Sequence, residues 1–269
     1  MLKYTLERFL SMLLVIFIII TATFLLMHSI PGGPFTGEKN LPPAVIQNIM
    51  ERYKLNDPLW KQYTDYLVNV VQFDFGPSFK YEDRTVNQII ADGLPISATL
   101  GFGSAGLALI LGIPAGIIAA LRQNKWPDYA VMFAATIGIS VPNFITATLL
   151  IYVLALKLEL LPAAMWGGIE YAIMPCMALA ALPTAVIARL TRSSMLDVMG
   201  QDYIRTAKAK GLSTFTVIWR HALKNALMPV VTYLGPMIAF ILLGSFVIEN
   251  IFAIPGLGRY FVMSIYNRD

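Results

Sequence analysis

The sequence predicts an all-α, polytopic membrane protein with five membrane-spanning helices. The 269 residues are 57% hydrophobic and only 13% charged, whereas soluble globular domains carry about 25% charged residues. Long runs without a charged residue recur along the chain. Each run is continuously apolar, unlike the alternating strands of a membrane β-barrel. The net charge of the segments between the runs changes sign in a regular order, as expected where loops alternate between the two sides of a membrane.

The charge-free runs define the expected spans. About 20 residues of α-helix cross the roughly 30 Å hydrocarbon layer, and four of the five runs are longer than this. The shortest run ends at Arg189, whose side chain can extend to the membrane surface. The five expected spans are residues 9–37, 93–121, 129–156, 171–188 and 225–248.

The charged segments predict the orientation. Lys3 and Arg8 precede the first run, so we expect a cytoplasmic N-terminus. This run is too long for a signal-peptide core, and no small-residue cleavage motif follows it, so we expect it to be retained. Residues 38–92 hold six basic and eight acidic residues and are expected outside. Residues 189–224 hold seven Lys or Arg against two Asp. Each such charge costs roughly 2.5–3.5 kcal/mol at the bilayer centre, so we expect a cytoplasmic loop.

These expectations divide the chain into three parts. Five spans leave the C-terminus outside, and residues 259–269 end no recognisable element, so we expect a sixth helix to follow in the natural protein. The parts are a first flank and span (1–30), an extracellular helical cap (31–95), and a membrane core (96–269) that holds the other four spans and includes the cytoplasmic loop 189–226.

The extracellular part is expected to hold two short helices. Residues 44–55 carry apolar residues at helical spacing. A second helix is expected to begin with Asp57 as N-cap and Pro58 as its first residue, and to continue through residues 59–70. The segment is too short for a large independent core. Contact with an external partner and a purely structural lid both stay open.

Several patterns that suggest chemistry have simpler explanations. Residues 101–106 fit G-x-G-x-x-G, but they lie within an expected span and have no acidic residue about 20 positions on, which argues against a dinucleotide site. Gly112 and Gly116 fit the small-xxx-small pattern of close helix packing. Cys176 lies in an apolar run and is expected to be a small buried side chain.

Other absences from the sequence exclude classes of function. The chain has no G-x-x-x-x-G-K-[ST] motif, so we expect no P-loop ATP site. His28 and His221 have no partner at ligand spacing, so no metal site is expected. No charged residue lies in the middle of an expected span, which argues against an ion-coupled carrier.

Within the basic loop, residues 201–211 predict a short helix. Asp202 suits the N-terminal end of the helix dipole, and Lys208 and Lys210 suit its C-terminal end. Gly211 is expected to adopt the left-handed conformation that ends a helix. A second helical stretch at 215–227 would complete a helix–turn–helix that can transmit a rigid-body push. A merely solvated loop remains the alternative. Three side chains are expected to share one face: Met199, Tyr203 and Ala207.

This loop resembles a known family. Thr206-Ala207-x-x-x-Gly211 is similar to the EAA loop of ABC importer permeases. Arg205 replaces the usual Glu, and His221-Ala-Leu-Lys224 departs from Ile-x-Leu-Pro. The loop is closer to that of the peptide-transport branch. Similar stretches occur at 27–34, 55–63, 73–79, 138–143, 187–195 and 244–258. From end to end the chain resembles the B-type permease subunit of oligopeptide/dipeptide ABC importers, most closely the oligopeptide permeases, which have a type I importer fold.

The resemblance implies a non-catalytic subunit that moves oligopeptides across the cytoplasmic membrane by alternating access. It implies a C-type permease partner, two cytoplasmic ABC ATPases that bind ATP and Mg, and an extracellular peptide-binding protein. No cofactor, metal or nucleic acid is implied for this chain. Small Ala207 would permit close approach to an ATPase, and Arg205, Lys208 and Lys210 would pair with its acids. The residues implied in ATPase coupling are Asp202, Tyr203, Arg205, Thr206, Ala207, Lys208, Lys210 and Gly211.

Two alternatives stay open. Relatives of this kind carry dipeptides, nickel or glutathione, and this subunit's sequence discriminates poorly between such cargoes. A membrane scaffold that docks an ATPase without transport is the second alternative, and peptide-stimulated ATP hydrolysis would separate it from a transporter.

Overall fold

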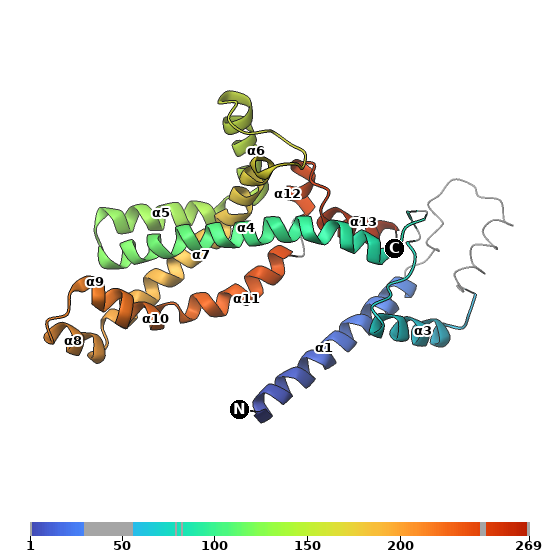
Figure 1. The fold of residues 1–269 in the computed structure, drawn as a ribbon, viewed down its shortest axis with the longest axis horizontal. Coiled ribbons are helices and arrows are strands. Elements are labelled where there is room, and N and C mark those ends of the chain that lie inside the picture. Colours follow the sequence, from blue (N-terminus) through green and yellow to red (C-terminus); the bar gives the residue numbers. More distant parts are fainter. Residues whose placement is uncertain (1, 30–55, 79, 82, 243–245, 268–269) are drawn as a thin grey trace. The chain divides into compact units, whose positions relative to one another are not determined.

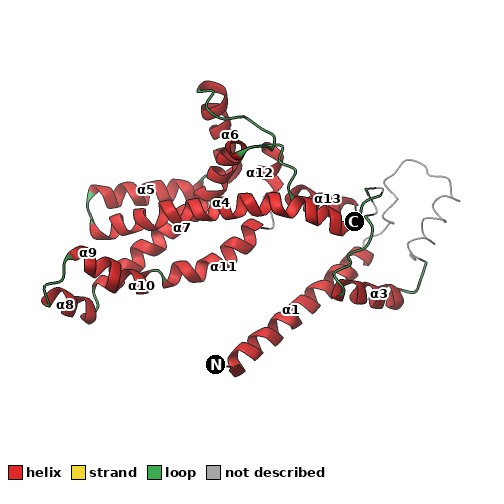
Figure 2. Cartoon of the chain, in the orientation of Figure 1, coloured by secondary structure: helices red, strands yellow, loops and turns green. Residues whose placement is uncertain are grey.

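The computed structural model describes residues 2–29, 56–78, 80–81, 83–242 and 246–267. In these residues the chain forms helices joined by turns, with an isolated β-bridge between Pro77 and Thr85 (Figure 2). The expected helix at 44–55 lies outside the described residues. The first elements are α1 (Leu2–Ser29), α3 (Leu59–Val71), α4 (Val86–Leu121), α5 (Trp126–Ser140), α6 (Asn143–Leu150), the π-helical η1 (Ile151–Lys157) and α7 (Ile169–Met199). They are followed by α8 (Asp202–Ala209), α9 (Thr214–Thr216), the π-helical η2 (Val217–Ala222), α10 (Leu223–Ala226), α11 (Met228–Leu242), α12 (Phe246–Ile251) and α13 (Leu257–Asn267).

Three described helices, α1, α4 and α7, are long and apolar enough to cross a membrane. Two further pairs meet the same criteria but are bent. Residues 126–140 and 143–157 meet at 103°, and residues 214–226 and 228–242 meet at 49°. The count reaches the predicted five if each bent pair forms one span. The predicted fold class, an all-α polytopic membrane protein, is confirmed.

The third expected span, 129–156, is not one straight helix. α5 ends at Ser140, and Val141 is extended, with φ −87° and ψ 119°. The next residue is Pro142, which precedes the first residue of α6. A proline disfavours the helical conformation of the residue before it and has no N–H to donate. The sequence Val141-Pro142 therefore breaks the run into two helices.

The expected cytoplasmic loop begins later than predicted. α7 continues from Ile169 to Met199, so the positions that we assigned to the start of the loop are helical. A helix of 31 residues is about 46 Å long. This exceeds the roughly 30 Å hydrocarbon layer. The charged end of α7 can therefore extend beyond the membrane without a break in the helix.

The chain forms two compact units, one made of Met1–Ile89 with Met263–Asp269 and the other of Ile90–Val262. In the first unit, α1 and α3 meet through Phe24, whose ring lies 5.2 Å from that of Tyr63 and 5.7 Å from that of Tyr66. The hydroxyl groups of Thr21 and Tyr63 form a hydrogen bond of 2.7 Å. The C-terminal end of α1 therefore carries the second helix of the predicted cap.

The predicted cap residue of α3 is wrong by one position. α3 begins at Leu59 with Pro58 as its N-cap, and the Pro58 carbonyl accepts hydrogen bonds from the Lys61 and Gln62 amides. The Asp57 carboxylate instead accepts a hydrogen bond of 2.8 Å from Lys61 Nζ, which raises the pKa of that amine. A proline fits before the first turn because the first amides of a helix have no partner within it.

In the second unit, three clusters of buried apolar side chains follow one another along α4 and α7. Each takes residues from both helices, so the two share one continuous interface. The α12 cluster consists of Leu100, Ala147, Met174, Ala178, Leu179, Ile248, Phe252 and Ile254. The middle cluster consists of Ala105, Ala108, Ala180, Ile187, Val230, Met237 and Ile241. The α8 cluster consists of Ala120, Met195, Val198, Ile204, Ala207, Val217, Ile218, Ala222 and Ala226.

The predicted small-xxx-small contact of α4 is confirmed. A Cβ added at Gly112 would lie 2.9 Å from the Thr184 carbonyl oxygen of α7. A Cβ added at Gly116 would lie 2.6 Å from the Ala188 carbonyl oxygen and 2.5 Å from Thr191 Cβ. The two helices touch at these glycines because no side chain separates them.

We expect Gly116→Ala to destabilise the folded chain by about 1–3 kcal/mol, because the new methyl group would push α7 away from α4. The matched control is Gly106→Ala in the same helix, where an added Cβ meets nothing within 4 Å. The control is expected to be neutral or to stabilise by up to about 1 kcal/mol through helix propensity. Thermal unfolding of the two variants in detergent measures the difference, and equal midpoints would contradict the expectation.

Candidate functional site

The predicted short helix of the basic segment forms α8. Gly200 and Gln201 separate it from α7, and Asp202 lies in its first turn and Lys208 in its last. These charges have the signs that the helix dipole favours at each end. After α8 the chain turns and continues through α9, η2 and α10 to Ala226, as the predicted second helical stretch required. The structure therefore contains the expected helix–turn–helix.

Gly211 ends this helix through its conformation and not through close packing. Its φ is +76°, in the left-handed region that residues with a side chain rarely adopt. Its N–H donates a hydrogen bond of 3.0 Å to the Lys208 carbonyl oxygen. A Cβ added at this position would meet nothing within 4 Å. The prediction of a left-handed glycine at the end of α8 is confirmed.

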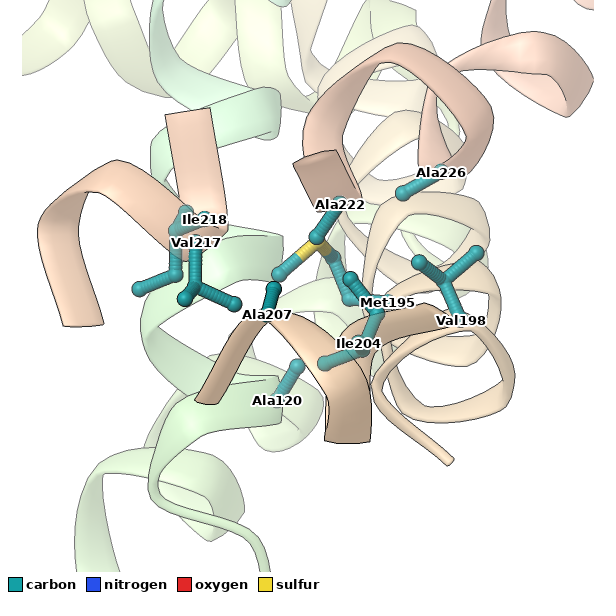
Figure 3. Close-up of a cluster of buried hydrophobic side chains, with 9 residues drawn as sticks. All are labelled: Ala120, Met195, Val198, Ile204, Ala207, Val217, Ile218, Ala222 and Ala226. Carbon is teal, nitrogen blue, oxygen red and sulfur yellow. The ribbon is translucent and has the colours of Figure 1, made fainter. Parts of the chain in front are cut away.

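The inner face of α8 is apolar and packs inside the chain. Ile204 is fully buried and Ala207 is 5% exposed. Figure 3 shows both side chains among those of the α8 cluster, with Met195 in the middle of the view. The close approach that we expected of Ala207 therefore occurs within this chain, where α8 meets η2 and α7. The Ala207 methyl group thus belongs to the α8 cluster and not to the solvent-facing side of α8.

The face predicted for α8 is also wrong in one respect. Tyr203 was expected to share a face with Ala207, but it is 41% exposed. Its hydroxyl accepts a hydrogen bond of 2.8 Å from Asn225 Nδ2, just before the end of α10. Ile204 occupies the buried face in its place. The spacing of Ile204 and Ala207, three residues apart among charged neighbours, is the sequence signal that would have identified this face.

The outer face of α8 is polar and basic. Apart from Ala207, every residue predicted for ATPase coupling is exposed. Arg205 Nη1 lies 3.4 Å from Asp202 Oδ1, but both side chains are exposed, and such pairs contribute about 0–1 kcal/mol. Thr206 Oγ1 donates to the Asp202 carbonyl oxygen at 2.9 Å. The guanidinium of Arg205 and the amines of Lys208 and Lys210 are thus presented to solvent on an anchored helix.

An ion pair that the sequence did not indicate braces α7 beside this site. Asp128 in the first turn of α5 accepts two hydrogen bonds from Arg192 in α7, at 2.5 Å to Oδ1 and 2.7 Å to Oδ2. The Asn124 amide donates to the same carboxylate at 3.0 Å. Asp128 is buried. The two residues are 64 positions apart and were assigned to different loops, so their pairing had no local sequence signal.

The family model of the binding-protein-dependent transport system inner membrane component matches residues 112–269, and the model of its N-terminal part matches residues 1–101. The chain belongs to this family. It is therefore an integral membrane permease component, and the predicted recognition is confirmed at this level.

Two relatives align with this permease over its whole length. The dipeptide transport system permease protein DppB of Bacillus subtilis is 54% identical over 269 residues, which cover all of this chain and 87% of that protein. The oligopeptide transport system permease protein OppB of Salmonella typhimurium is 48% identical over 271 residues, which cover all of this chain and 89% of that protein.

Two solved structures share the permease fold. The inward-facing MetNI methionine ABC transporter gives a TM-score of 0.52 at 17% identity, with 66% of this chain and 80% of that chain covered. An amino acid ABC transporter determined with histidines gives a TM-score of 0.50 at 16% identity, with 68% and 81% covered. These matches support the predicted type I importer fold.

Proposed function

We propose that this chain is the B-type permease subunit of an ATP-driven importer that moves oligopeptides across the cytoplasmic membrane. The whole-length identity to an oligopeptide permease supports the cargo class. The observation that carries the mechanism is α8, which is buried on one face and basic on the other. A helix held in this way can receive a force on its outer face and pass it to the helices beneath.

The outer face of α8 is the proposed contact with a cytoplasmic ATPase. Arg205, Lys208 and Lys210 are exposed cations that would pair with carboxylates on the ATPase surface. Tyr203 and Thr206 would lie beside them, and Gly211 would set the turn. Ala207 acts from the inner face, as part of the packing that holds the helix. ATP and Mg are bound by the ATPase in this scheme, and this chain supplies no catalytic group.

The α8 cluster would transmit the motion. It joins α8 to α4, α7, η2 and α10 through buried apolar side chains. A packed interface of this kind has low compressibility, so displacement of α8 would move these helices together. ATP binding would thereby switch the path between its two openings, and hydrolysis would reset it. The path would form between this chain and a C-type permease, with an extracellular binding protein delivering peptide.

The topology follows from the same proposal. The N-terminus and residues 189–226 would face the cytoplasm, and residues 31–92 would lie outside, as the charges predict. The three-part division of the chain at residues 30 and 95 belongs to this proposal. In the structure, α4 already begins at Val86.

A dipeptide is the second candidate cargo, because a relative named as a dipeptide permease is 54% identical over the whole chain. Reconstitution of this chain with its partner subunits and uptake of labelled peptides of two to six residues would separate the two. Uptake of dipeptides alone would replace the oligopeptide assignment. Stimulated ATP hydrolysis without uptake of any peptide would favour a scaffold.

We expect Gly211→Pro to abolish coupling between ATP hydrolysis and uptake while the chain still inserts in the membrane. Proline holds φ near −65°, far from the observed +76°, and removes the N–H that donates to Lys208. The matched control is Gly211→Asn, because asparagine tolerates the left-handed region. Uptake per ATP hydrolysed in proteoliposomes is the measurement. Equal coupling in the two variants would count against a role for this turn.

A further inference from the structure

A buried carboxylate at the other end of the unit has no part in the function proposed so far. Glu249 lies in α12 and is 1% exposed. It belongs to residues 244–258, one of the stretches that carry the family resemblance. α8 lies at one end of the unit, and α12 with the first turn of α13 lies at the opposite end (Figure 1).

The Glu249 carboxylate joins three segments. Ser97 Oγ, on α4, donates to Oε1 at 2.8 Å, and the Gly258 amide, in the first turn of α13, donates to Oε2 at 2.8 Å. Ser97 Oγ in turn accepts a hydrogen bond of 2.8 Å from the Leu257 amide. These bonds satisfy the first amides of α13, which have no partner within the helix.

This cap also explains why the chain forms a helix after residue 256, where we expected no recognisable element. A carboxylate at a helix N-terminus is stabilising because it accepts the free amides and opposes the helix dipole. The cap comes from another element, eight residues before α13 begins. The sequence signal for a helix cap lies directly before the helix, and Glu249 is not at such a position.

The glycines of this stretch make the arrangement possible. A Cβ added at Gly256 would lie 2.5 Å from Glu249 Oε2 and 2.7 Å from Ser97 Oγ. A Cβ added at Gly258 would lie 2.9 Å from Oε2. On α4, a Cβ added at Gly93 would lie 3.1 Å from Leu257 Cα. Backbone therefore approaches the carboxylate and α4 at positions where any side chain would intrude.

Apolar packing surrounds the carboxylate. Ile248, Phe252 and Ile254 are buried in the α12 cluster with residues of α4, α6 and α7. The Met165 amide donates to the Phe252 carbonyl oxygen at 2.8 Å, which fixes the segment before α7 to the same turn. Burial raises the pKa of the Glu249 carboxyl, and the hydrogen bonds from Ser97 and the Gly258 amide oppose this shift. The group is thus enclosed, and its partners are fixed.

α4 and α7 connect this joint to α8. Both helices contribute to the α12 cluster, the middle cluster and the α8 cluster in turn. From Met174 to Met195 the distance along α7 is about 32 Å. A displacement at the α8 end can therefore reach the α12 end through one continuous interface.

We propose that Glu249 is a positioning residue for transport. It holds α12 and the first turn of α13 as one rigid body with the part of α4 around Ser97, so that motion imposed at α8 moves this end of the unit as a whole. The inference rests on the proposed function for the source of the motion. The rigid joint itself rests only on the contacts of Glu249 and Ser97 with each other and with the Leu257 and Gly258 amides.

The test uses Glu249→Gln in the full chain assembled with its partner subunits. Glutamine keeps the size but replaces one acceptor oxygen with an NH₂ group, so one of the donors around Glu249 loses its partner. We expect peptide uptake per ATP hydrolysed to fall about tenfold, with basal hydrolysis within about twofold of wild type. Ser97→Ala should act in the same direction.

The matched control Glu170→Gln changes an exposed carboxylate in the first turn of α7 and should change neither rate. Wild-type coupling in Glu249→Gln would overturn the proposal.

Hydrogen exchange supplies a second readout that does not depend on the cargo. In the wild-type complex, the amides of Leu257 and Gly258 should exchange slowly both at rest and when trapped with vanadate. In Glu249→Gln they should exchange at least about tenfold faster. Fast exchange in the trapped wild-type complex would show that the joint opens and would overturn the proposal. If wild type moves no peptide, the proposed function fails. The exchange measurement then still decides whether Glu249 holds α12 and the first turn of α13 together.

Discussion

Replacing Arg192 with leucine is expected to destabilise the folded chain by about 3–5 kcal/mol. The substitution leaves the Asp128 carboxylate buried with the Asn124 amide but without a cation. A buried charge without its partner costs far more than the lost pair would contribute at a surface. Both guanidinium bonds, of 2.5 and 2.7 Å, disappear at once. α5 should then separate from α7 next to the proposed coupling site.

Thermal unfolding in detergent is the measurement, with two matched comparisons. Arg189→Leu removes an exposed arginine one turn earlier in α7. The Arg189 guanidinium donates to Thr136 Oγ1 at 2.7 Å. This substitution should cost about 1 kcal/mol or less. The double substitution Asp128→Leu with Arg192→Leu removes both charges and should be more stable than Arg192→Leu alone. If the double variant lost as much stability as the single variants Asp128→Leu and Arg192→Leu together, the broken ion pair would not be the cause of the instability.

Replacing Ile204 with alanine is expected to destabilise the α8 cluster by about 2–5 kcal/mol. Ile204 is fully buried between α8 and the helices beneath, and truncation leaves a cavity where α8 is attached. The exposed cations of α8 are unchanged, so an ATPase should still bind. The force on the helix should no longer reach α4 and α7. We therefore expect reduced stability together with reduced uptake per ATP hydrolysed.

Leu212→Ala is the control for this substitution. Leu212 directly follows Gly211 but is 39% exposed, so its truncation should change stability by no more than about 0.5 kcal/mol. ATPase pull-down, unfolding midpoint and coupled uptake are measured for both variants. If Ile204→Ala kept full coupling, α8 would not transmit motion through the α8 cluster.

Much of the fold could be predicted from the sequence because the membrane restricts what a chain can do. A continuous apolar run of sufficient length must be helical, since unpaired backbone groups are costly in hydrocarbon. The run at 93–121 became part of α4 for this reason. Where a run was broken, at Val141-Pro142, the local signal was present but the bend of 103° was not predictable from it. The angle depends on what each half packs against.

The candidate site was predicted in part. The helix of α8, its end at Gly211 and its basic character follow from local propensity, dipole and charge. The buried face did not follow, because Tyr203, Ile204 and Ala207 all lie near one side of a short helix. The packing against Met195 and Val217 decides which of them are covered. The spacing of Ile204 and Ala207 indicates an apolar face, but the contacts that cover it and leave Tyr203 exposed join residues far apart in the sequence.

By itself the sequence determined the membrane class of the chain, the approximate spans, the basic segment around α8 and the family. These depend on composition, run length and charge, which act on each segment separately. Only the tertiary structure decided that Arg192 pairs with Asp128 and that Glu249 caps α13 while it binds Ser97. A buried charge must find partners wherever the fold brings them, and these partners lie as many as 152 positions apart.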